Sequence, residues 1–227
     1  MRVAFFNNKG GVGKTTLSVN TACYASFAGL RVLFVGTDRQ GDGFRFFARG
    51  KKRAEKSAVL KLTKNLSAIY HPMSVPKINS SVDLTIIDCP PSVQVASEYM
   101  VDVWIIILTS RFSFENSFNV FPALFKSGAK IIFLLNRKGE GGLRITRKLE
   151  AAINEVPNLS YYSRGIEQHN AFKRMESALL PVWCDQWGEK PGEDIREFSH
   201  YLLNTVCGFK VPKATLVQDI PWARRSS

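Results

Sequence analysis

The stretch NNKGGVGKTT at positions 7–16 follows a short apolar run, residues 3–6, and decides the fold that we expect. Its closing GKTT matches the end of the G-x-x-x-x-G-K-[ST] pattern, in which glycines let backbone N–H groups approach a phosphate closely. Asn8 stands where that pattern has its first glycine, and Lys9 is a second lysine that the pattern does not contain. A strand, a phosphate-binding loop and a helix are therefore predicted in this order, with one cation unexplained.

Three side chains are candidates for holding a nucleotide phosphate and its metal ion. Lys14 would reach the β- and γ-phosphates, and the hydroxyl of Thr15 would bind Mg²⁺. Asp88 ends an apolar strand, where a second carboxylate would hold the same Mg²⁺ through water. The loop residues that we expect to bind the nucleotide are Gly10, Gly11, Val12, Gly13, Lys14, Thr15 and Thr16.

Short β-branched runs alternate with helical segments along the chain. This order predicts an α/β fold, with a mostly parallel, twisted sheet and helices on both of its faces. The predicted strands are residues 3–6, 31–35, 82–88, 103–108, 129–135 and 159–162. The predicted helices are residues 14–28, 44–66, 92–101, 114–126, 143–156, 168–180 and 193–207. We expect one domain over residues 1–208 and a poorly ordered tail over 209–227.

The charge of the chain favours a polyanionic partner. Its 227 residues carry a formal net charge of +12, an excess typical of proteins that bind nucleic acid or an anionic membrane surface. The four cysteines form no C-x-x-C pair, which excludes the usual spacing of a metal or redox site. The sequence begins with no signal peptide and contains no membrane-spanning run, so we expect a cytoplasmic location.

Together with three later segments, the loop resembles the deviant Walker A motif of the ParA/MinD ATPases. TDRQGD (37–42) is similar to the family's D-x-D-P-Q-G loop, and TIIDCPPS (85–92) is similar to its Walker B stretch. IIFLLNR (131–137) resembles the strand whose terminal asparagine faces the adenine, and SRGIEQHNAF (163–172) resembles a late family segment. These matches cover most of the chain, whose length resembles that of small plasmid-type ParA proteins such as ParF.

The resemblance implies a P-loop NTPase fold in which two subunits sandwich two ATP molecules with Mg²⁺. Lys9 would cross the interface to the partner's nucleotide, like an arginine finger supplied in trans. Asp38 would position the attacking water, and Asn136 with Arg137 beside it would contact the adenine. The implied catalytic residues are Lys9, Lys14 and Asp38.

The function implied by this resemblance is DNA segregation, of a plasmid or of a chromosome region. ATP would close a homodimer, and the dimer would bind double-stranded DNA on the nucleoid without sequence preference. A ParB-like or other centromere-binding adaptor would stimulate slow hydrolysis. Gly36 and Arg39 replace the first aspartate and the proline of D-x-D-P-Q, which leaves the hydrolysis rate open. The candidate DNA contacts are Arg49, Lys51, Lys52, Arg53, Arg164, Lys173 and Arg174.

Three other functions are possible for a sequence of this kind. A MinD-like positioning ATPase would need a C-terminal amphipathic helix, whereas Pro212 and Pro221 bracket only residues 213–220. An iron–sulfur carrier would need a C-x-x-C pair. A metabolic P-loop enzyme would need a pocket for an acceptor substrate, and the sequence does not locate one. No membrane partner is therefore expected, and the MinD-like function is the first alternative.

Overall fold

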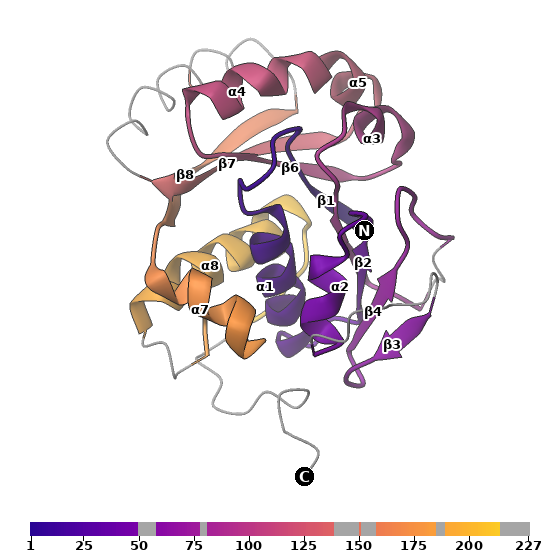
Figure 1. Ribbon diagram of the computed structural model, residues 1–227, viewed down its shortest axis with the longest axis vertical. Helices are drawn as coiled ribbons and strands as arrows, with labels where there is room; N and C mark the ends of the chain where they lie inside the picture. Colours follow the sequence, from indigo (N-terminus) through magenta and orange to yellow (C-terminus); the bar gives the residue numbers. More distant parts are fainter. Residues whose placement is uncertain (50–57, 78–80, 139–149, 151–157, 185–188, 214–227) are drawn as a thin grey trace.

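A single eight-stranded sheet forms the centre of the computed structural model, which describes residues 1–49, 58–77, 81–138, 150, 158–184 and 189–213 (Figure 1). The strand order is β3-β4-β2-β5-β1-β6-β7-β8. All neighbouring strands are parallel except β3, which runs antiparallel to β4. The strands are β1 (Arg2–Phe6), β2 (Val32–Gly36), β3 (Val59–Lys61), β4 (Leu66–Tyr70), β5 (Leu84–Asp88), β6 (Val103–Leu108), β7 (Lys130–Lys138) and β8 (Leu159–Glu167).

Helices lie on both faces of the sheet (Figure 1). One side carries α1 (Lys14–Phe27), α2 (Asp42–Phe47), α7 (Asn170–Ala178) and α8 (Glu189–Tyr201), which continues into a π-helical turn, Leu202–Val206. The other side carries α3 (Val93–Glu98), α4 (Arg111–Ser117), the 3₁₀ turn η1 (Phe118–Val120) and α5 (Phe121–Lys126). Among the described residues, no helix combines the length and the apolar character needed to cross a membrane.

The central strand β6 shows why its sequence lacks a polar alternation. All six of its residues are buried. Val103, Ile105 and Ile107 belong to the hydrophobic core under α1 and α8, whereas Trp104, Ile106 and Leu108 belong to the core under α3 to α5. A strand covered on both faces reads as a continuous apolar run, because neither face meets water.

The carboxyl ends of three strands meet at one edge of the sheet. Phe5 on β1 and Gly36 on β2 both pair with Asp88 on β5 in the parallel register. The loops that follow these strands therefore emerge side by side, and ligands of open α/β sheets bind at such an edge. The loop from residue 7 to residue 13 is one of them.

The predicted strands and most predicted helices are confirmed, but the long helix expected over 44–66 is wrong. The helix α2 ends at Phe47, β3 lies within the same stretch, and β4 begins at its last residue, Leu66. The apolar run of β4 adds to the edge of β2 and satisfies the backbone groups there, which a local helix would not do. Residues 50–57, which include Lys51, Lys52 and Arg53, lie outside the described residues, as do the end of the tail and nearly all of the helix predicted at 143–156.

Candidate functional site

The loop between β1 and α1 is shaped by two glycines and one asparagine. Gly11 and Gly13 adopt left-handed backbone angles, with φ of 70° and 97°, which residues with a Cβ adopt only at a cost. The side chain of Asn7 is buried, donates to the carbonyl of Ile107 at 2.7 Å and accepts from the N–H of Lys9 at 2.8 Å. The loop is thus anchored on β6 and leads directly into the first turn of α1.

Lys14 lies inside this loop, whereas Lys9 is exposed on it. The ammonium group of Lys14 donates to the carbonyl of Lys9 at 3.1 Å, and only 7% of the residue is exposed. Burial lowers the pKa of Lys14, and the nearby carboxylates of Asp88 and Asp38 act in the opposite direction. The two lysines are therefore oriented differently, as expected if Lys14 serves the phosphates of its own subunit.

Thr15 and Asp88 form a pair at the edge of the sheet. The Thr15 hydroxyl donates to Oδ2 of Asp88 at 2.8 Å, and Asp88 is 1% exposed. Burial raises the pKa of Asp88 to about 7, although the hydrogen bond from Thr15 and the charge of Lys14 lower it. The second carboxylate oxygen, Oδ1, is buried and accepts no hydrogen bond from any described residue. A hydroxyl and an unpartnered carboxylate oxygen are hard oxygen ligands of the kind that Mg²⁺ prefers, directly or through water, so the pair fits this metal ion.

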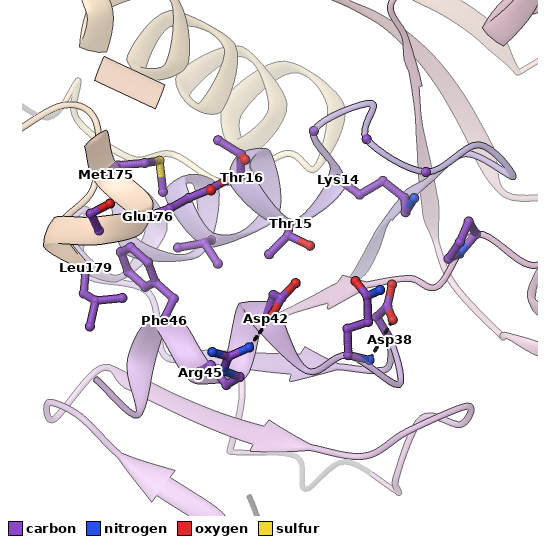
Figure 2. Close-up of a pocket in the computed structure, with 17 residues that line it drawn as sticks. Lys14, Thr15, Thr16, Asp38, Asp42, Arg45, Phe46, Met175, Glu176 and Leu179 are labelled. Carbon is purple, nitrogen blue, oxygen red and sulfur yellow. Dashed lines mark hydrogen bonds and ion pairs between the residues drawn. The ribbon is translucent and has the colours of Figure 1, made fainter. Parts of the chain in front are cut away.

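A cavity of about 790 Å³ opens in front of the loop (Figure 2). Ligand pockets for small molecules and cofactors have volumes of about this size. Its walls come from the loop and the first turns of α1, from the segment that follows β2, from α2 and from α7. The lining residues are Gly10, Gly11, Gly13, Lys14, Thr15, Thr16, Val19, Asp38, Gln40, Asp42, Arg45, Phe46, Pro91, Met175, Glu176, Ser177 and Leu179.

Asp38 reaches this cavity because the segment after β2 is tied to the end of β5. The backbone N–H and the hydroxyl of Thr37 both donate to the carbonyl of Asp88, at 3.0 and 2.9 Å. The carboxylate of Asp38 accepts from the N–H of Gln40 at 3.0 Å, which closes a tight turn. Lys14 and Asp38, two of the predicted catalytic residues, therefore line the same cavity.

Asn136 is brought to the loop rather than to the cavity wall. Its side-chain amide donates to the carbonyl of Val12 at 2.7 Å, and the residue is 7% exposed. A Cβ added at Gly13 would lie 2.4 Å from the same amide nitrogen. The asparagine thus supports the phosphate loop from behind, and its contact with adenine stays a prediction. The side chain of Arg137 lies outside the described part of the chain.

The basic residues predicted to contact DNA are spread over several elements. Lys173 and Arg174 are exposed on α7. Arg164 on β8 is exposed as well, and it pairs with Glu197 of α8 at 3.3 Å, a residue that also pairs with Lys213. Arg49 is exposed just after α2. The structure therefore brings Arg164 near α8, where its charge is partly offset.

Sequence reasoning missed the contributions of α2 and α7 to the cavity. Asp42, Arg45 and Phe46 come from α2, and Met175 and Glu176 come from α7. Asp42 had a visible signal, because it is a further carboxylate directly after the D-x-D-P-Q-like loop. The α7 residues had none, since only the tertiary fold carries that helix across the first turns of α1.

The fold and the loop together resemble those of P-loop proteins of the deviant Walker A type. A parallel sheet, a glycine loop between its first strand and first helix, a buried lysine and a Thr–Asp pair at the strand ends are the elements of that class.

Comparisons with known proteins agree with this class. Residues 1–74 match the family model described as "AAA domain". The chromosome-partitioning ATPase Soj of Treponema pallidum is 30% identical over 122 residues, 40% of this chain and 48% of the relative. Soj of Thermus thermophilus is 54% identical over 41 residues, 18% of this chain and 16% of the relative. The chain thus matches less than half the length of either relative, and it resembles ParA/MinD-type ATPases in sequence as the motifs predict.

Solved structures with low identity show the same fold. A plasmid partition protein of Borrelia burgdorferi bound to AMPPNP has a TM-score of 0.63 at 16% identity, with 92% of this chain and 99% of that one covered. The MinC:MinD complex of Aquifex aeolicus has a TM-score of 0.66 at 16% identity, with 95% and 98% covered. Cobyrinic acid a,c-diamide synthase of Mycobacterium smegmatis, with an ATP analogue and magnesium, has a TM-score of 0.63 at 18% identity, with 94% and 99% covered.

Proposed function

We propose that this protein is a ParA-like ATPase that moves or positions DNA, with ATP and Mg²⁺ as its ligands. The observation that carries the proposal is the convergence of Lys14, Thr15 and Asp38 on one cavity, with the buried Asp88 bonded to Thr15 behind it. The sequence resemblance to Soj agrees with it, because that relative is described as a chromosome-partitioning ATPase.

The proposed roles are those that the motifs and the family resemblance imply, and the positions of the side chains support them. Lys14 neutralises charge on the phosphates, and the loop N–H groups add the positive end of the α1 dipole. Thr15 and Asp88 would hold Mg²⁺, Asp88 through water, and the bound ion would supply positive charge beside the phosphates. Asp38 lines the cavity near Lys14 and orients the attacking water. Hydrolysis is slow until a ParB-like or other adaptor stimulates it.

Dimerisation is the proposed work of the second lysine. Lys9 is exposed on the loop, and its own backbone N–H is already bonded to Asn7. Because Lys9 is exposed, its side chain could reach the nucleotide of a partner subunit, where the low dielectric of a closed interface would strengthen the contact. ATP then joins two copies of the chain into a homodimer.

DNA binding is the proposed consequence of this dimer. The chain has a formal net charge of +12, and a dimer doubles the number of basic side chains available to phosphates. Arg49, Lys173 and Arg174 are exposed, and such side chains contact the DNA backbone without reading its sequence.

A titration of double-stranded DNA with the protein in ADP, ATP or a non-hydrolysable ATP analogue, each at two salt concentrations, tests the proposal. We expect tight binding only with ATP or the analogue, and a steep loss of affinity at the higher salt concentration. DNA binding that ignores the nucleotide would contradict the proposal. Absent DNA binding, together with ATP-dependent binding to anionic vesicles, would favour the MinD-like alternative.

A further inference from the structure

We propose that Asp42, the first residue of α2, positions the water shell of the nucleotide-bound Mg²⁺. It would thereby replace the first aspartate of the D-x-D-P-Q pattern, where this chain has Gly36. This inference rests on the proposed function, since it concerns the same metal ion. The motifs do not predict this role, because both aspartates of the D-x-D-P-Q pattern correspond to positions 36 and 38, before Asp42.

Position 36 itself has no acidic side chain to offer. Gly36 ends β2 and pairs with Asp88 across the sheet, so a carboxylate there would stand next to Asp88. A Cβ added at Gly36 would touch both the Cβ and the backbone N of Phe44 at 3.5 Å. In this chain the first turn of α2 lies over the glycine, and the aromatic ring of Phe44 is buried there.

The same turn of α2 is pressed against Asp88. A Cβ added at Gly43 would lie 2.8 Å from Oδ2 of Asp88 and 2.6 Å from the ring of Phe34. Contacts this short exclude a side chain, so the backbone of α2 approaches the buried carboxylate as only glycine allows. Asp42 immediately precedes this glycine, at the start of α2.

The carboxylate of Asp42 lines the cavity together with Thr15 and Asp38. In Figure 2 it lies between Arg45 and Thr15. Its side chain is 53% exposed, and Nη1 of Arg45 donates to it at 3.0 Å, one turn further along α2. The guanidinium occupies part of the hydrogen-bonding capacity of the carboxylate and leaves other lone pairs for water.

A second observation, at the end of β5, favours a cation near the phosphate loop. Oδ1 of Asp88 is fully buried and accepts no hydrogen bond among the described residues, which is costly for a carboxylate unless a ligand satisfies it. Mg²⁺ keeps several of its waters when it binds to proteins and phosphates, and those waters need acceptors. Asp42 and Asp88 supply such acceptors from two elements, α2 and β5.

Variants of Arg45 and Glu176 can separate a specific role of Asp42 from a general effect of charge in the cavity. The guanidinium competes with bound water for the carboxylate of Asp42, so its removal should strengthen the effect of the metal ion. Glu176 on α7 is the matched control, because its carboxylate lines the same cavity from another helix. A general change in the negative charge of the cavity would affect Asp42 and Glu176 alike.

The test is the affinity of the full chain for a fluorescent ATP analogue, measured with Mg²⁺ and with EDTA. The quantity of interest is the factor by which Mg²⁺ tightens binding. We expect Asp42→Asn to reduce this factor by about tenfold. A tenfold change corresponds to roughly 1.4 kcal/mol, which is the size of one hydrogen bond to a charged group. Arg45→Gln should increase it, and Glu176→Gln should leave it unchanged. Binding of Mn²⁺ with the unlabelled nucleotide, followed by electron paramagnetic resonance, should show the same order.

The possible results distinguish a failure of the Asp42 role from a failure of the proposed function. An unchanged factor in Asp42→Asn, or an equal reduction in Asp42→Asn and Glu176→Gln, would overturn the role of Asp42 while leaving the proposed function intact. A wild-type chain whose nucleotide affinity ignores Mg²⁺ would overturn both. Circular dichroism melting checks that the variants are folded. We expect them to be, because the Asp42 side chain is about half exposed.

Discussion

Asp88 is the residue on which most of the site depends. It ends β5, and its carboxylate accepts a hydrogen bond from the Thr15 hydroxyl and lies against α2 at Gly43. Its backbone carbonyl accepts from the hydroxyl of Thr37. Burial raises its pKa to about 7 from an ordinary value of 3.8. The folded chain therefore keeps an ionisable group in surroundings that favour the neutral form.

This burial predicts a pH dependence for the stability of the ligand-free protein. Because the pKa of Asp88 is higher in the folded state, the unfolded chain loses the proton first, and stability falls as the pH rises from about 4 to about 7. Asp88→Asn removes the titrating group. We expect the free energy of unfolding of the variant, relative to wild type, to rise by about 1–3 kcal/mol over that range.

Urea unfolding at several pH values measures this difference. The buried amide of the variant adds a constant offset, so the slope with pH carries the information. A difference that stays constant between pH 4 and pH 7 would show that Asp88 is ionised throughout. Asp102→Asn, at an exposed position of the chain, serves as the control for a change of surface charge.

At the residue scale, the sequence predicted the groups whose chemistry is local to a motif. Lys14, Thr15 and Asp88 lie where the phosphate-loop pattern and the end of an apolar strand indicate. The partner of Asn136 could not be predicted, since its bond to Val12 depends on how β7 meets the loop. For the same reason the close approach of α2 to Asp88 could not be predicted, since it depends on the tertiary contact at Gly43.

At the scale of elements, the buried Asn20 helps to join α1 to the last third of the chain. The side chain of Asn20 accepts from the N–H of Val182 at 2.8 Å and donates to the carbonyl of Thr16 at 2.7 Å. Its amide nitrogen also lies 3.2 Å from the sulfur of Met175, and its backbone carbonyl accepts from the indole N–H of Trp183. The asparagine thus fixes α7 and the segment before α8 against the helix that carries the phosphate loop.

Truncation of this side chain should loosen that connection. Asn20→Ala leaves the N–H of Val182 buried without an acceptor, which costs about 1–3 kcal/mol of unfolding free energy. Chemical denaturation of the variant measures the loss, and Asn119→Ala at an exposed position is the matched control. A loss no larger than that of the control would mean that Val182 finds another acceptor and that α7 does not depend on Asn20.

The elements differ in how far the sequence could predict them. Buried parallel strands are recognisable in a sequence as apolar runs, and all six predicted strands are present. The strands β3 and β4 were missed because both are short and their pairing decides the conformation more than local composition does, β4 with β2 and β3 with β4. The wall formed by α7 was predicted as a helix, yet its place over the cavity follows from contacts distant in sequence.

At the scale of the whole molecule, the two lysines of the loop predict a separation of binding from assembly. Lys9→Gln should leave nucleotide affinity close to that of wild type, because Lys14 and the loop N–H groups remain. The variant should stay monomeric with ATP, since the charge offered to the partner's nucleotide is gone. Light scattering with ATP measures the mass, and Lys64→Gln at another exposed position controls for the loss of one positive charge.

An ATP-dependent dimer of Lys9→Gln as stable as that of wild type would contradict the trans role. Loss of nucleotide binding in the same variant would instead assign Lys9 to its own subunit. The DNA titration belongs to this scale as well, since salt acts on the sum of the basic side chains and not on any one of them.

The contact between Gly13 and Asn136 has a consequence for how this sequence can change over time. The asparagine amide occupies the space into which any side chain at position 13 would grow. A side chain at position 13 would thus meet two obstacles, the left-handed backbone angle of the loop and the Asn136 amide from β7. In an alignment of related chains, glycine should therefore be retained at position 13 even where position 136 varies.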